Sequence, residues 1–115
     1  MAAGIIKPSK PCYSNHCMPR FGLDAYVIDV LMRDLVNHDR MPSAFLVYLW
    51  LWRQTRGSRR SRYGASLQTI ATETGLSKSS VQNAVRLLSA RKLIGVNHRG
   101  FTEAPIYEVF EQWKR

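Results

Sequence analysis

The chain has 115 residues, enough for one domain with a short appendage and too few for two independent cores. Its composition, 45% hydrophobic and 22% charged, is that of a globular protein and excludes a disordered tail. Seventeen lysines and arginines against eight acids give a net charge of +9. So strong a basic excess indicates a polyanionic partner, which is DNA, RNA or, less often, an anionic membrane surface.

The longest apolar run, residues 44–52, is much shorter than the about 20 residues that a membrane span needs. The first residues lack the apolar segment of a signal peptide. We therefore expect a cytoplasmic, nucleoid-associated protein. Two cysteines, Cys12 and Cys17, are too few for a disulfide framework of the secreted kind.

The basic residues are concentrated in the middle of the chain. Residues 1–39 hold four bases and four acids, and residues 103–115 hold two bases and three acids. Residues 40–102 hold eleven bases and one acid, Glu73. This distribution predicts a localised basic surface on a folded unit, and the alternative is a charged face that only keeps the protein soluble.

Residues 1–21 contain Pro8, Pro11 and Pro19 without any periodic pattern, which predicts a flexible N-terminal arm. From residue 23 to about residue 37, apolar residues recur at spacings of three and four, which predicts an amphipathic helix. The apolar residues of this helix are Leu23, Tyr26, Val27, Val30, Leu31 and Leu35.

Pro42 suits the first turn of a second helix, which is apolar nearly all round over residues 44–54. Such a helix must be covered on more than one side, by the preceding helix, the rest of the domain or a second subunit. Residues 55–66 are rich in Gly, Ser and Arg and predict a loop.

Ser66 is the predicted N-cap of a helix that ends near Thr74, with Gly75 as its stop. Ser77 caps a further helix, which runs to about Arg91 and presents its apolar positions to the core: Val81, Ala84, Val85 and Leu88. Alternating apolar residues predict strands over 93–98 and 105–110, joined by a turn over 99–104.

Residues 66–96, SLQTIATETGLSKSSVQNAVRLLSARKLIGV, resemble the winged helix-turn-helix domains of bacterial transcriptional regulators and of plasmid or phage replication initiators. Residues 42–52, PSAFLVYLWLW, look like the first helix of that domain. The resemblance covers residues 42–110 and does not separate the subfamilies. It rests on Ala71, Gly75, Ser77, Ala84, Leu88, Leu93 and Ile94.

The resemblance implies a mainly α fold with a small β-hairpin, a winged helix-turn-helix with an extra N-terminal helix. We expect a flexible arm over residues 1–21 and an additional helix, a candidate dimerisation element, over residues 22–39. The winged helix-turn-helix domain is expected over residues 40–111 and a tail over residues 112–115. A homodimer through residues 23–52 is one interpretation of the apolar helices, and packing within one chain is the other.

The outer face of the helix over residues 77–91 is polar and contains no acid. In the major groove, Gln and Asn pair with adenine and Arg pairs with guanine. An ordinary solvated helix face is the alternative interpretation. The candidate base-reading residues are Ser79, Gln82, Asn83 and Arg86.

Contacts to the DNA backbone are expected from helix N-termini, from the arginine-rich loop and from the hairpin tip. The candidates are Ser66, Ser77, Lys78, Arg56, Arg59, Arg60, Arg62, His98 and Arg99.

Cys12, His16 and Cys17 together with His38 are a weak candidate for zinc, because the paired C-x-x-C spacing is absent. We expect ordinary reduced thiols, no metal and no cofactor. The sequence shows no nucleophile–base pattern and no phosphate-binding glycine loop, so we expect no enzymatic activity.

These features favour a small transcriptional regulator that binds double-stranded DNA sequence-specifically. One alternative is the DNA-binding domain of a replication initiator or plasmid-maintenance protein. Another is a winged-helix module for protein–protein interaction, which an acidic or apolar recognition face would favour. RNA binding is disfavoured, because the major groove of A-form RNA is too narrow for a helix.

Overall fold

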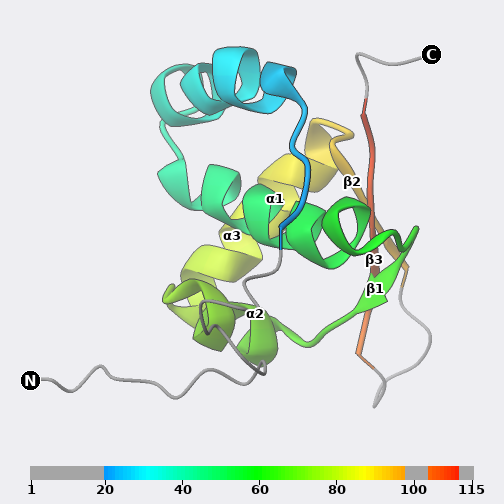
Figure 1. Cartoon of the computed structure of the whole chain (residues 1–115). Coiled ribbons are helices and arrows are strands. Elements are labelled where there is room, and N and C mark those ends of the chain that lie inside the picture. Colours follow the sequence, from blue (N-terminus) through cyan, green and yellow to red (C-terminus); the bar gives the residue numbers. More distant parts are fainter. Residues whose placement is uncertain (1–19, 98–103, 112–115) are drawn as a thin grey trace, which may run out of the picture.

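The computed structural model describes residues 20–97 and 104–111 (Figure 1). Its helices are η2 (Val27–Leu31), η3 (Asp34–His38), α1 (Pro42–Gln54), η4 (Arg56–Ser58), α2 (Leu67–Thr74) and α3 (Lys78–Ala90). Its strands are β1 (Tyr63–Gly64), β2 (Ile94–Asn97) and β3 (Ile106–Val109).

The N-terminal helical segment, residues 25–38, is wound more widely than an ordinary α-helix. The amide of Met32 donates to the carbonyl of Val27, and the amide of Asp39 donates to that of Asp34, five residues back in each case. Among the apolar residues that the sequence assigned to its buried face, Val27, Leu31 and Leu35 are buried.

The assignment of Tyr26 to that buried face was wrong, because its side chain is 38% exposed. Tyr26 directly precedes Val27, so on a helix it lies about 100° around the axis from the buried row of Val27, Leu31 and Leu35.

Helix α1 lies at the centre of the molecule, between the N-terminal helical segment on one side and α2 on the other, with the strands at its end (Figure 1). It packs against η3, α2, α3 and β3. All of its residues except Pro42 and Leu46 are buried or half-buried. The prediction that this helix is covered on several sides is therefore confirmed, and the cover comes from its own chain.

Two polar groups of α1 are satisfied by backbone carbonyls far away in the sequence. The Tyr48 hydroxyl donates to the carbonyl of Phe110 at 3.1 Å, and the Trp52 indole N–H donates to the carbonyl of Gly22 at 2.8 Å. These bonds fix both ends of the described chain to the central helix.

The two capping serines and the turn glycine lie where the sequence predicts them. The Ser66 hydroxyl accepts from the amide of Thr69, and the Ser77 hydroxyl accepts from the amide of Ser80. Gly75 has a φ of +80°, the left-handed conformation that stops α2 and redirects the chain into α3. Local sequence signals therefore determine this helix–turn–helix unit.

The strands form a three-stranded antiparallel sheet in the order β1-β3-β2. The two predicted strands are confirmed with slightly shorter bounds, and Ile94 pairs with Val109 across them. The prediction of a loop over residues 55–66 was wrong in part, because this stretch contains η4 and β1. Tyr63 of β1 pairs with Tyr107, a distant partner that no local pattern reveals.

The expected fold class is confirmed: mainly helical, with a small antiparallel sheet and an extra helical segment before α1. Within the described residues, none of the helices has both the length and the apolar character that crossing a bilayer requires.

We expect the substitution Gly75→Ala to lower the free energy of unfolding by about 1–2 kcal/mol, because a Cβ is strained in the left-handed conformation. Urea denaturation followed by circular dichroism measures this loss. The matched control is Gly22→Ala, since a Cβ there meets no atom within 4 Å, and its effect should stay within about 0.5 kcal/mol. Equal effects of the two substitutions would contradict the left-handed turn.

Candidate nucleic-acid interface

Helix α3 separates a buried row from an exposed polar surface. Its apolar residues Val81, Ala84 and Leu88 are buried against the core. The four candidate base-reading residues are all exposed: Ser79, Gln82, Asn83 and Arg86. The structure thus presents the candidate residues together on one helix.

A hollow of about 190 Å³ lies beside two of these four residues. Gln82 and Arg86 line it, while Ser79 and Asn83 do not. The remaining walls are apolar or half-buried residues from α2, α3 and the strands: Leu67, Val85, Val96, Pro105 and Tyr107. Gln82 and Arg86 therefore face the space between α3 and the hairpin.

This hollow could not be recognised from the sequence, because its walls come from four separate stretches of the chain. The one local signal was the alternation in the strands, which places Val96 opposite Tyr107. Burial raises the pKa of the Tyr107 phenol, so this wall stays uncharged at neutral pH.

The N-terminus of α3 combines a cap with an exposed cation. The Ser77 hydroxyl accepts from the Ser80 amide at 3.1 Å and lies 3.3 Å from the Ser79 hydroxyl. Lys78 is exposed beside it. Because the first amides of a helix have no acceptor within the helix, this end attracts a phosphate. Ser66 forms the same kind of cap at the start of α2, with the Thr69 amide at 3.1 Å.

The arginines between α1 and α2 do not form one uniform cluster. Arg59, Arg60 and Arg62 are exposed, and the Arg60 guanidinium lies 5.7 Å from the ring centre of Tyr63. Arg62 lies against β2 and β3, where it lines a second hollow with Asn97 and Glu108.

Arg56 differs from these three in having an acidic partner. Its Nε lies 3.2 Å from a carboxylate oxygen of Glu111, and its Nη2 donates to the carbonyl of Val109 at 3.1 Å. A phosphate would have to compete with Glu111 for this guanidinium. Arg56 thus ties η4 to the end of β3.

Some predicted residues lie outside the described parts of the chain. They are Cys12, His16 and Cys17, considered for zinc, and His98 and Arg99 of the hairpin turn. His38 is described, and its Nδ1 lies 3.0 Å from a carboxylate oxygen of Asp39. Over residues 20–97 and 104–111, no group of three His, Cys, Asp or Glu residues is placed to hold a metal ion.

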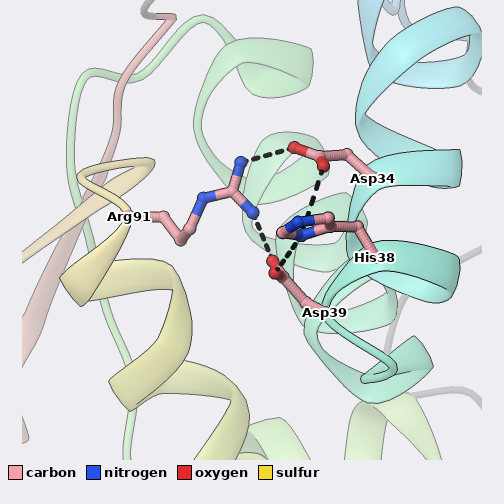
Figure 2. Close-up of polar contacts among 4 residues, drawn as sticks. All are labelled: Asp34, His38, Asp39 and Arg91. Atoms are coloured by element: carbon pink, nitrogen blue, oxygen red, sulfur yellow. Dashed lines mark hydrogen bonds and ion pairs between the residues drawn. The ribbon is translucent and has the colours of Figure 1, made fainter.

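Arg91, directly after α3, anchors this helix to the N-terminal helical segment (Figure 2). Its guanidinium contacts Asp34 through Nη2 and Asp39 through Nη1. Its hydrogen bonds to Asp34 and Asp39 raise the pKa of Arg91, although burial opposes the shift. Burial raises the pKa of Asp39, but hydrogen bonds from His38 and Arg91 outweigh it and hold this pKa below its ordinary value of 3.8. No local pattern in the sequence predicts this cluster, because Arg91 lies more than 50 residues from both carboxylates.

A carboxylate with a lowered pKa in the folded state stabilises the fold above its unfolded pKa and loses that contribution as the pH falls. We therefore expect the contribution of Asp39 to the free energy of unfolding to be constant above about pH 5 and to fall as the pH drops below about 4.

The substitution Arg91→Met should remove about 1–2 kcal/mol at neutral pH and flatten the acid-dependent loss, since Arg91 is one third exposed and partly screened. Urea denaturation over a pH series measures both effects. The control Arg86→Met makes the same change on the exposed face of α3 and should leave stability within about 0.5 kcal/mol. An acid dependence unchanged by Arg91→Met would contradict this role.

Residues 41–94 match the family model described as "Helix-turn-helix domain". No curated protein and no solved structure matches the chain. The matched stretch contains α1, α2, the Gly75 turn and α3, and it indicates DNA binding. The antiparallel hairpin of β2 and β3 directly follows α3. Residues 41–94 are thus similar to helix-turn-helix domains, and together with the hairpin they have an architecture consistent with a winged helix-turn-helix.

Proposed function

We propose that this protein binds double-stranded DNA sequence-specifically and acts as a small transcriptional regulator. Helix α3 enters the major groove, and the hairpin of β2 and β3 contacts the backbone or the adjacent minor groove. The observation that carries this proposal is the exposed, acid-free face of α3 within a helix-turn-helix domain.

The residue types on this face match the chemistry of base edges. Gln82 and Asn83 each offer an amide that pairs with adenine, and Arg86 offers a guanidinium that pairs with guanine. Ser79 at the start of the helix donates to or accepts from either kind of base. Because Gln82 and Arg86 also line the hollow, we assign them to the bases nearest the hairpin.

Backbone contacts in this proposal come chiefly from Lys78, Arg59, Arg60 and Arg62, which are exposed. Ser66 and Ser77 act through the helix ends that they cap. Three further residues remain predictions from the sequence: Arg56, which is held by Glu111, and His98 and Arg99.

We place the protein in the cytoplasm, at the nucleoid, as a homodimer formed through residues 23–52. Two copies related by a two-fold axis present two recognition helices to half-sites about 34 Å apart. In this proposal the chain binds DNA and catalyses no reaction.

The first test is fluorescence anisotropy with random-sequence duplex DNA at low and moderate salt. Binding that weakens steeply with salt supports the proposal, because neutralised phosphates release counterions. Selection from a random pool then yields the preferred site. If the protein fails to bind duplex DNA at low salt, the proposal is wrong, and an interaction module for protein partners takes its place.

We expect Arg86→Ala to weaken binding to the selected site by about 1–3 kcal/mol and to relax specificity at one base pair. Competition anisotropy with singly substituted sites measures both effects. If Arg86→Ala instead weakened binding to all sequences equally, Arg86 would be a backbone contact.

The matched comparison is Arg60→Ala, the same change at a residue assigned to the phosphates. It should weaken binding to all sequences alike and reduce the slope of log K against log salt by about 1. A salt slope equal to that of the native chain would remove Arg60 from the interface.

A further inference from the structure

The N-terminal helical segment carries an apolar row that the described residues 20–97 and 104–111 leave exposed. Val27, Leu31 and Leu35 form a buried row at a spacing of four residues. The residues that follow each of them form a second row at the same spacing: Ile28, Met32 and Val36 are 41%, 39% and 39% exposed. This segment therefore exposes a continuous apolar strip to solvent.

The next row along the helix surface is charged and also exposed. It contains Asp29 and Arg33, one helical turn apart. Over the described residues, neither side chain takes part in a salt bridge, whereas Asp34 of the same segment is paired with Arg91. The strip is thus flanked by one acid and one base.

We propose that two copies of this chain associate by laying their N-terminal helical segments side by side in antiparallel orientation. This inference rests on the proposed function, since it supplies the two-fold pair that reads two half-sites. In the antiparallel arrangement Asp29 of each copy faces Arg33 of the other. A parallel two-fold pair would instead place the charged rows of the two copies on opposite sides of the apolar strip, where Asp29 and Arg33 form no pairs between copies.

The register follows from the same residues. The apolar row extends from Ile28 to Val36, so its midpoint is Met32. The midpoint between Asp29 and Arg33 is Leu31, the neighbouring residue. A single two-fold axis near Met32 therefore matches apolar to apolar and acid to base at once, as a self-complementary interface requires.

The two kinds of contact have different effects. Burial of Ile28, Met32 and Val36 removes apolar surface from water and supplies the affinity. The exposed charge pairs contribute little affinity and set the orientation. One helix pair is a small interface, so we expect a weak dimer in solution that DNA with two half-sites strengthens.

The test uses charge reversal in the full-length chain. Asp29→Arg places two pairs of arginines in contact across the interface, and Arg33→Asp places two pairs of carboxylates in contact. Each variant alone should raise the dimer dissociation constant at least about tenfold in sedimentation velocity over a concentration series. Thermal unfolding checks that both variants remain folded.

Mixing the two variants should restore association, because every base at positions 29 and 33 of one chain then faces an acid of the other. The double variant Asp29→Arg/Arg33→Asp should also dimerise with itself. Met32→Glu should abolish the dimer, since it brings two carboxylates together at the axis. If single variants dimerise as well as the native chain, or if mixing restores nothing, the antiparallel pairing is wrong.

Binding to DNA with one half-site distinguishes this failure from failure of the proposed function. A native chain that stays monomeric and still binds duplex DNA overturns only the dimer. A chain that dimerises as described but does not bind DNA overturns only the DNA-binding function.

Discussion

Helix α1 is apolar nearly all round, and the other elements of the fold are arranged to cover it. The N-terminal helical segment covers one side, α2 and α3 cover another, and β3 closes one end. Its buried side chains, with Tyr48 and Leu51 fully inaccessible, supply much of the hydrophobic stabilisation. Because the cover comes from its own chain, α1 does not need a second subunit, and the proposed dimer uses the outer row at Ile28, Met32 and Val36 instead.

The position of helix α3 follows from that central packing and from one ionic contact. Helix α3 packs against α1 along its buried row, and Arg91 at its end is held by Asp34 and Asp39 (Figure 2). The start of α3 is set separately, by Gly75 and by the Ser77 cap. A helix held at both ends and along one side presents its outer face in a single orientation, and a base-reading surface needs such preorganisation.

The basic residues of the chain fall into two groups that composition cannot separate. Arg91 and Arg56 are paired with acids and hold elements together, whereas Lys78, Arg60 and Arg86 are exposed and have no acidic partner within the described residues. Net charge indicates a polyanionic partner in general, but only the structure shows which cations remain for it. The paired arginines bridge segments far apart in the chain, a separation at which sequence spacing carries no information.

The sequence by itself determined the features that depend on near neighbours: the caps at Ser66 and Ser77, the turn at Gly75, the polar face of α3 and the two strands of the hairpin. Only the tertiary structure decided the pairing of β1 with β3, the hollow beside Gln82 and Arg86, and the partners of Arg91. These depend on contacts between distant segments, which form only when the hydrophobic surfaces of the whole chain pack together.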